Sequence, residues 1–342
     1  MGQKNFFQIL GPAVFFLMLW IGPPSDMSEP AFKVMAATIW IAIWWMTEAI
    51  PVPITSFLPM ILYPLTNSVP LRVIAPSYAN PIIYIFVGGF ILALAMQKWE
   101  LHKRIALSII SITGTNMRQI ILGFILASAF LSMWISNTAT TVMMLPIALS
   151  IISQIKEFAR ASSLTQKDME GFGKALILSI AYSSSIGGIA TLVGTPTNLI
   201  FADAIEKFYG IVIPFDQWIG IGLPISLVIL VSCWLVLTYF AFSLSTEQVE
   251  GSTDIIKGEL KKLGKMSYEE KWVLAIFLFV ALAWITRRYL IAPFYPSFND
   301  TIIAMIGAVS LFLIPSKKTG RQIMDWQSAI KLPWGVILLF GG

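Results

Sequence analysis

The sequence contains little charge for its length. Lys, Arg, Asp and Glu make up 12% of the 342 residues, whereas 57% are hydrophobic. A soluble protein of this size needs far more charge to cover its surface. Apolar runs recur along the chain at about the length of a membrane span, roughly 20 residues. The composition therefore predicts an all-α polytopic membrane protein that is embedded in a lipid bilayer.

Cysteine and histidine are almost absent. The single cysteine, Cys233, excludes a disulfide within the chain. The single histidine, His102, stands beside Lys103 and Arg104, and we expect it to be a solvated surface residue. A transition-metal site requires clustered His, Cys or carboxylate side chains, and the sequence shows no such cluster.

The first part of the chain contains several apolar segments. We expect membrane spans at residues 6–21, 32–50, 54–65 and 82–96. Residues 98–112 carry charge at one end and spaced apolar residues along their length. This pattern is typical of an amphipathic helix that lies at the membrane surface.

Residues 119–155 are too long for one span and are interrupted by Ser136, Asn137 and Thr138. Two structures fit: two full crossings with a tight turn, or two half-helices that enter and leave at the same face. A bilayer offers no water to buried polar groups, so polar residues at that depth must face protein or a water-filled cavity. We favour a re-entrant hairpin, because its tip would place these side chains in the middle of the membrane, where they could bind a small solute.

A second interruption occurs within residues 175–205. Gly194 and Pro196 favour an unwound segment there. The start of a half-helix presents unpaired N–H groups that suit a carboxylate, and the end of one presents carbonyl oxygens that suit Na+. Neither polar cluster contains Lys or Arg, so bound cations must help to balance an anion. This is a physical reason for coupling an anion to Na+.

The last part of the chain contains a span at 218–240, a polar connection at 243–271 and further apolar segments. Residues 335–342 resemble residues 82–89, as expected for an inverted repeat. The sequence stops inside this apolar run, and we expect the second repeat to be incomplete and the chain truncated.

The distribution of positive charge predicts the topology. If the N-terminus is cytoplasmic and the hairpin is re-entrant, most Lys and Arg residues fall in cytoplasmic loops. We therefore expect a multi-pass protein of the plasma (inner) membrane. The basic residues are scattered over loops, which argues against a nucleic-acid partner.

Three motifs together resemble those of the divalent anion:sodium symporter family, which includes sodium-coupled di- and tricarboxylate carriers. They are Ser136-Asn137-Thr138, the run at residues 48–53 and the run at residues 194–198. The resemblance implies an inverted-repeat elevator-type transporter with a re-entrant hairpin and a broken helix, working as a homodimer.

The same resemblance implies a division of the chain. Residues 1–115 would be the scaffold helices of the first repeat with the amphipathic surface helix. Residues 116–242 would be part of the transport domain, made of the hairpin at 119–155, the broken helix at 175–205 and the span at 218–240. A cytoplasmic connection at 243–271 and the start of the second-repeat scaffold at 272–342 would follow.

The resemblance also implies a site. Residues like Ser132, Ser136, Asn137 and Gly194 would form a sodium site, and residues like Asn137, Thr138 and Thr195 would face the substrate carboxylate. Pro196 and Asn198 are secondary candidates. Thr197 departs from the family, in which a second proline is frequent at this place.

The expected function is secondary active transport of dicarboxylates, meaning succinate-like C4 acids, coupled to Na+. A dicarboxylate exchanger and a sodium-coupled sulfate or citrate transporter remain alternatives. An enzyme is not expected, because the polar breaks contain no His, Asp or Glu for acid–base or metal chemistry.

Overall fold

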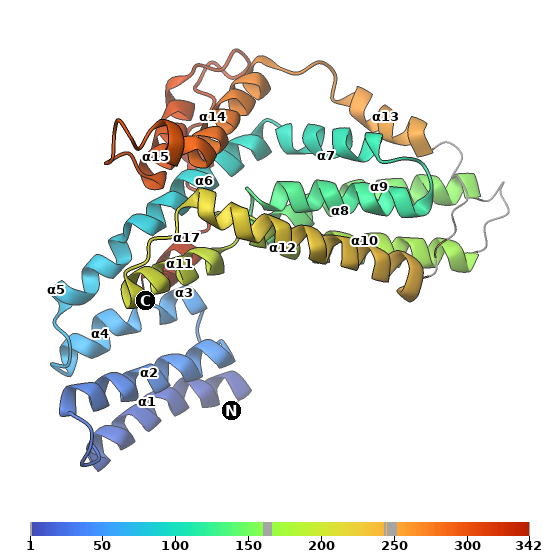
Figure 1. The fold of residues 1–342 in the computed structure, drawn as a ribbon. Coiled ribbons are helices and arrows are strands. Elements are labelled where there is room, and N and C mark those ends of the chain that lie inside the picture. The colour runs from blue at the N-terminus through green and yellow to red at the C-terminus, as the bar shows by residue number, and fades with distance from the viewer. Residues whose placement is uncertain (1, 160–165, 243, 245–251, 342) are drawn as a thin grey trace. The chain divides into compact units, whose positions relative to one another are not determined.

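The computed structural model describes residues 2–159, 166–242, 244 and 252–341, and their secondary structure is helical (Figure 1). The chain divides into two compact units. The first contains Met1–Val87 and Lys331–Gly342, and the second contains Gly88–Ile330. Helix α6 passes from the first unit to the second.

The first unit is built from long helices followed by short ones. Its elements are α1 (Gln3–Ile21), α2 (Glu29–Thr47), α3 (Val52–Thr55), α4 (Leu58–Leu65), α5 (Leu71–Ile74), the 3-10 helix η1 (Ala75–Ala79), the start of α6 (Pro81–Lys98) and α17 (Trp334–Leu339). The predicted span at 54–65 is two short helices in the structure. Pro59 and Pro64 lie in this stretch and Pro51 and Pro53 directly precede it. A proline removes a backbone donor, so one long helix is disfavoured.

The second unit contains the interrupted helices. Its elements are the end of α6, α7 (Leu101–Ile112), α8 (Met117–Ser132), α9 (Asn137–Ala159), α10 (Gln166–Ile189), α11 (Pro196–Tyr209), α12 (Phe215–Leu235) with the π-helix η2 (Val236–Ala241), α13 (Ser252–Lys262), α14 (Tyr268–Leu290), α15 (Asp300–Leu313) and α16 (Trp326–Ala329).

Among the described residues, 7 helical stretches are long and apolar enough to cross a membrane. They are Lys4–Ile21, Glu29–Thr47, Leu71–Lys98, Asn137–Ile155, Asp168–Ile189, Phe215–Ala241 and Tyr268–Leu290. Shorter apolar helices occur at Val52–Leu65, Met117–Ser132 and Asp300–Leu313. The predicted all-α polytopic class is confirmed.

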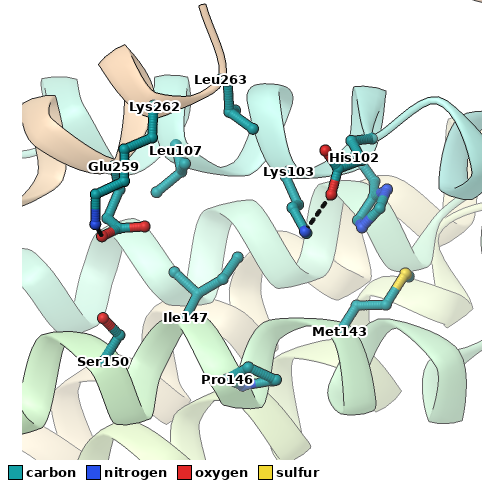
Figure 2. Close-up of a pocket in the computed structure, with 11 residues that line it drawn as sticks. His102, Lys103, Leu107, Met143, Pro146, Ile147, Ser150, Glu259, Lys262 and Leu263 are labelled. Atoms are coloured by element: carbon teal, nitrogen blue, oxygen red, sulfur yellow. Dashed lines mark hydrogen bonds and ion pairs between the residues drawn. The ribbon is translucent and has the colours of Figure 1, made fainter.

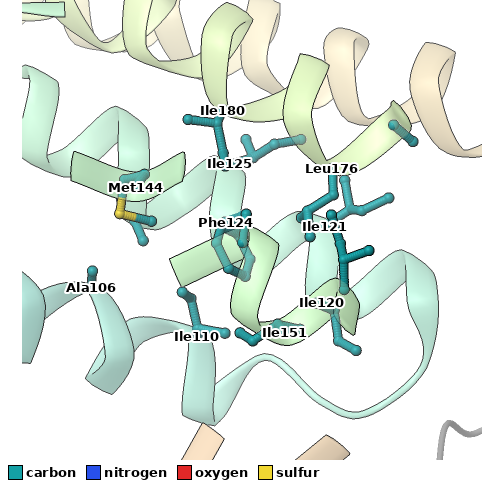
Figure 3. Close-up of a cluster of buried hydrophobic side chains, with 14 of the residues drawn as sticks. Ala106, Ile110, Ile120, Ile121, Phe124, Ile125, Met144, Ile151, Leu176 and Ile180 are labelled. Carbon is teal, nitrogen blue, oxygen red and sulfur yellow. The ribbon is translucent and has the colours of Figure 1, made fainter. Parts of the chain in front are cut away.

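The core of the second unit lies where α7, α8, α9 and α10 pack together (Figure 3). Ile110, Phe124, Ile151 and Leu176 come from these four helices, and all are buried. Helix α8 starts with a capping box, in which the Asn116 side chain accepts a hydrogen bond from the Gln119 backbone N–H. This start fixes the helix that carries the chain to the first interruption.

The prediction for His102 is wrong. Its side chain is only 4% exposed, and Nδ1 lies 3.1 Å from the Met96 carbonyl oxygen. The expectation followed from the charged neighbours Lys103 and Arg104, but successive residues of a helix point in different directions, and α7 buries one face against α8. Burial lowers the pKa of His102 and so favours the neutral ring.

The polar connection at 243–271 contains a helix that the sequence reading did not anticipate, α13. Residues 243 and 245–251 of this connection lie outside the described residues. The connection ends at a second capping box, in which the Ser267 hydroxyl accepts from the Glu270 backbone N–H at 3.2 Å. The placement of this connection in the cytoplasm stays a prediction.

Candidate functional site

The two predicted interruptions lie side by side in the second unit. The chain between α8 and α9 spans residues 133–136, and the chain between α10 and α11 spans residues 190–195. The Thr191 hydroxyl donates a hydrogen bond to the Met133 carbonyl oxygen and so joins the two breaks. The C-terminal ends of two helices and the N-terminal ends of two others therefore converge on one region.

The side-chain amide of Asn137 lies at the centre of this region. With the amide oriented to satisfy its neighbours, Nδ2 donates to the carbonyl oxygens of Ser184 at 3.2 Å and Gly194 at 3.3 Å. It also lies 2.8 Å from Ser132 Oγ. One amide thus connects the end of α8, the start of α9, the last turns of α10 and the second break. We call Ser132, Asn137, Gly188 and Gly194 the Asn137 layer.

The two glycines of the Asn137 layer allow this close approach. A Cβ atom on Gly188 would lie 2.3 Å from the Asn137 amide. A Cβ atom on Gly194 would lie 2.5 Å from the Gly188 carbonyl oxygen and 3.0 Å from the Ser132 carbonyl oxygen. The distances of 2.3 and 2.5 Å are too short for a Cβ atom, so glycine is the residue that fits at these two positions.

Asn198 secures the start of α11 against the end of α10. Its buried Nδ2 donates to the carbonyl oxygens of Gly188 at 2.8 Å and Thr191 at 2.7 Å. The Gly188 carbonyl belongs to the last turn of α10, where no next turn supplies a donor, and Thr191 lies just beyond the end of this helix. Pro196 is the first residue of α11, a position at which its missing N–H costs nothing.

The break at residues 133–136 is also held by aromatic packing. Trp134 stacks parallel to Trp284 of α14, with ring centroids 6.5 Å apart, and meets Phe277 edge-to-face at 5.0 Å. Phe215, the first residue of α12, stacks on Trp284 at 4.9 Å. Trp134, which lies within the break, is therefore fixed by α12 and α14.

The structure brings together some of the predicted site residues. Ser132, Asn137, Gly194 and Asn198 are connected through the contacts above. Ser136 Oγ accepts from the Ala139 backbone N–H at 3.4 Å, which places it at the start of α9. Thr138 is exposed in the first turn of α9, and Thr195 Oγ1 lies 3.5 Å from Thr197 Oγ1. In the described part of the chain, no hydrogen bond joins Thr138 or Thr195 to the Asn137 layer, so their roles stay predictions.

Sequence reasoning missed the structural roles of Thr191, Gly188 and the Ser184 carbonyl. It also missed the contact made by Trp218 of α12, whose Nε1 donates to the Ile189 carbonyl oxygen at 2.9 Å, although the helix itself corresponds to the predicted span at 218–240. The sequence could have indicated the role of Thr191, because a threonine just beyond a helix end can donate a hydrogen bond to an unpaired carbonyl oxygen. A backbone carbonyl such as that of Ser184 has no signature in the sequence.

A pocket of about 460 Å³ lies apart from the Asn137 layer, between α7, α9 and α13 (Figure 2). Lys103 and Lys262 on its rim are each paired, with Glu100 and Glu259 respectively. Its floor includes Ile147 of α9. Because the charges on its rim neutralise each other, this pocket offers no excess positive charge for an anion.

The chemistry of the Asn137 layer is that of neutral oxygen atoms. The predicted site residues carry hydroxyl, amide and carbonyl groups and no titratable side chain. Within the described residues, no group of three or more His, Cys, Asp or Glu side chains is placed to hold a metal ion. Neutral oxygens at helix ends suit a hard cation such as Na+, and the N-terminal ends of α9 and α11 suit an anion.

These features define a class: a polytopic helical membrane protein in which two broken helices form a neutral, oxygen-rich site. A family model described as the sodium:sulfate symporter transmembrane region matches residues 3–342, and the chain belongs to this family. The resemblance inferred from the three sequence motifs is therefore confirmed.

Curated relatives agree with this assignment. A sodium-dependent dicarboxylate transporter, SdcS, of Staphylococcus saprophyticus subsp. saprophyticus is 43% identical over 338 residues, which cover 98% of this chain and 65% of the relative. SdcS of Staphylococcus aureus (strain USA300) gives the same identity and coverage. The chain thus spans just under two thirds of the length of these relatives.

Proposed function

We propose that the protein is a secondary active transporter, not an enzyme, and that it moves succinate-like C4 dicarboxylates across the plasma (inner) membrane together with Na+. The observation that carries this proposal is the convergence of helix ends around the Asn137 amide. Membership of the sodium:sulfate symporter family and the names of the staphylococcal relatives support it.

The proposed sodium site consists of Ser132, Ser136, Asn137 and Gly194. The Ser132 hydroxyl and the Gly194 carbonyl both lie within hydrogen-bond distance of the Asn137 amide, so the oxygen atoms are already gathered. A bound Na+ would replace amide–carbonyl contacts with ion–oxygen contacts. It would also supply positive charge in a region that contains no Lys or Arg of its own.

The proposed anion site consists of Asn137, Thr138 and Thr195, with Pro196 and Asn198 fixing the geometry. Thr195 is the N-cap residue of α11, with extended backbone and no side-chain capping bond. Its hydroxyl and the first N–H groups of the helix are therefore available to a carboxylate. Exposed Thr138 occupies the corresponding first turn of α9.

The finer features of the family resemblance belong to the same proposal. They are the inverted repeats, the elevator movement, the homodimer, the cytoplasmic N-terminus and the division at residues 115, 242 and 271. The apolar surfaces of α1 and α12 support a lipid-facing location for these helices, since each exposes several large hydrophobic side chains.

The family description favours one alternative substrate, sulfate. Dicarboxylate exchange and citrate transport use the same chemistry, because each anion can be held by helix N-termini and hydroxyl groups. The observations on the Asn137 layer do not depend on which divalent anion is bound.

The test is uptake into liposomes by the protein expressed from its complete reading frame. Radiolabelled succinate should accumulate with an inward Na+ gradient and not with K+ alone. Asn137→Ala should lower this uptake about 10- to 100-fold, because a polar side chain that holds several partners together contributes about 1–3 kcal/mol.

Thr141→Val is the matched control. Thr141 lies one turn beyond Asn137 in α9, and its hydroxyl donates only to the Asn137 backbone carbonyl at 2.9 Å. This variant should retain uptake. Succinate uptake that needs internal dicarboxylate and ignores Na+ would replace symport with exchange, and uptake of sulfate alone would replace the substrate.

A further inference from the structure

Three buried hydroxyl groups lie behind the Asn137 layer. Ser128 of α8, Thr140 of α9 and Ser184 of α10 are completely buried. None of the three side-chain oxygens has a hydrogen-bond partner among the described residues. This is unusual, because a buried serine in a helix commonly bonds to its own backbone, as Ser183 does to the Ser179 carbonyl oxygen.

The positions of these residues place them one helical turn behind the Asn137 layer. Residues three or four apart lie on the same face of a helix. Ser128 precedes Ser132 by one turn, and Thr140 follows Asn137 by one turn. Ser184 precedes Gly188 by one turn, and its carbonyl oxygen accepts from the Asn137 amide at 3.2 Å. Each of the three hydroxyls thus lies one turn from the Asn137 layer on one of the same three helices, and we call them the hydroxyl layer.

The turn beyond the hydroxyl layer is apolar. One further turn from the hydroxyls leads to Phe124 on α8, Met144 on α9 and Ile180 on α10, which are all buried in one hydrophobic cluster (Figure 3). The hydroxyl layer is thus enclosed between the Asn137 layer and the hydrophobic core. In such surroundings a hydroxyl without a partner is destabilising.

We propose that Ser128, Thr140 and Ser184 form a binding site for one buried water molecule that positions Asn137 from behind. A buried water typically makes three hydrogen bonds to polar groups that have no other partner, which matches three hydroxyls on three packed helices. A hard cation takes roughly six or more oxygen ligands, and only three hydroxyl groups are available here, so a water molecule with about three partners fits this donor set better. The water would join α8, α9 and α10 one turn behind the Asn137 amide and so fix its orientation.

The first test uses the complete protein in sodium-free, choline-containing buffer. Thr140→Val keeps the shape of the side chain and removes the hydroxyl. With a bound water, the variant should unfold a few degrees below the wild type, because Ser128 and Ser184 lose a shared partner; Thr140→Ser should restore the midpoint. If the hydroxyl is simply unpaired, its removal should raise the midpoint or leave it unchanged, and either result overturns the proposal. Thr141→Val is the control for a threonine that is bonded within its own helix.

The second test measures how the unfolding midpoint rises with added Na+, and this part rests on the proposed function. Thr140→Val should need several-fold more Na+ for half of the shift, and Thr140→Ser should behave like the wild type. An unchanged Na+ requirement would overturn the positioning role. An effect of Thr140→Val that appears only with Na+ would make the hydroxyl an ion ligand and overturn the water site. If the wild type itself shows no shift with Na+, the proposed sodium coupling fails, while the sodium-free comparison still decides the water site.

Discussion

Two of the helix interruptions in the second unit are completed in opposite ways. One is the break at residues 133–136, beside the Asn137 layer. The other is the elbow between α6 and α7, where Glu100 adopts a left-handed backbone conformation with φ 58°. At the elbow, Lys98 pairs with Asp325 at 2.6 Å and Trp99 Nε1 donates to the Ile323 carbonyl oxygen at 3.0 Å. The protein itself fills the hydrogen-bonding positions around the elbow.

Arg104 of α7 connects the elbow to the start of α14 and the residues before it. Its guanidinium donates to both carboxylate oxygens of Glu270, at 2.9 and 3.3 Å, and to the Gly264 carbonyl oxygen at 3.0 Å. The Arg104 and Glu270 side chains are only 15% and 7% exposed. A bidentate, sheltered pair of this kind fixes both position and orientation.

The break at 133–136 contains no charged residue and leaves polar groups available. In α8, α9 and α10, which pack around this break, the hydroxyls of Ser128, Thr140 and Ser184 have no partner in the described part of the chain. At the neighbouring break, 190–195, α11 begins without a side-chain cap. The elbow and the break at 133–136 thus differ in whether the protein itself satisfies their polar groups. A break closed by the protein's own ion pairs stabilises the fold, whereas a break with available neutral oxygens and N–H groups is suited to a ligand.

The largest expected effect on uptake comes from adding a side chain at Gly194, in the break at residues 190–195. Gly194→Ala would place a Cβ atom 2.5 Å from the Gly188 carbonyl oxygen, which is backbone and cannot rotate away. Overpacking of this kind costs about 1–3 kcal/mol, so we expect a loss of sodium-dependent uptake of about 10- to 100-fold. Uptake into liposomes, corrected for the amount of folded protein, measures it.

The control for this substitution is Gly220→Ala in α12. Gly220 has open space around the position of a Cβ atom, and alanine is a better helix former, so uptake should be unchanged. Equal loss in both variants would show that the effect is general helix destabilisation and would remove the distinction between the two kinds of break.

Much of the fold could be predicted, because long apolar runs report the thickness of the bilayer and proline and glycine report where a helix is interrupted. Long apolar runs gave the spans, and Gly194 and Pro196 gave the second interruption. The burial of His102 could not be predicted, because it depends on which face of α7 meets α8. Helix α13 was missed because a charged, polar segment shows no membrane periodicity.

The candidate site could be predicted only in part. Ser132, Asn137 and Gly194 came from a family motif, and the structure brings them together around one amide. The contribution of Ser184 is a backbone carbonyl, which any residue could supply. Thr191 was visible as a polar residue, but its bond to Met133 joins segments that are distant in sequence. Such pairings arise from tertiary packing.

A smaller effect on transport and a clear effect on stability are expected at the elbow. Arg104→Ala leaves Glu270 without its partner in a sheltered place, and breaking such a pair costs about 3–5 kcal/mol. Thermal unfolding of the purified protein should show the loss, whereas the Na+ concentration for half-maximal uptake should not change. A shifted Na+ requirement would mean that the elbow and the Asn137 layer are coupled.

Lys103→Ala provides the matched control for Arg104→Ala. Lys103 lies next to Arg104 on α7, but its pair with Glu100 is substantially exposed, with 40% and 53% of the two side chains accessible. Exposed pairs contribute about 0–1 kcal/mol, so this variant should unfold close to the wild type. A loss as large as that of Arg104→Ala would contradict the role given to the sheltered pair.

The smallest expected effect is a pH-dependent one at the elbow. The hydrogen bond from Lys98, the capping of Ser328 N–H and the charge of Lys98 lower the pKa of Asp325 from 3.8 to about 2. A carboxylate with a lowered pKa stabilises the folded state above its unfolded pKa, and this contribution is lost as the pH falls from about 4 towards 2. Asp325→Asn should therefore lower stability by about 1 kcal/mol at pH 7.

The unfolding midpoints of Asp325→Asn and the wild type should approach each other as the pH is lowered from 5 to 3. A difference that stays constant over this range would mean that the Asp325 charge contributes nothing and that only its shape matters. The same titration sharpens the contrast between the two breaks. The Asn137 layer has no titratable group, so its sodium requirement should not follow the protonation of Asp325, whereas the stability of the elbow should.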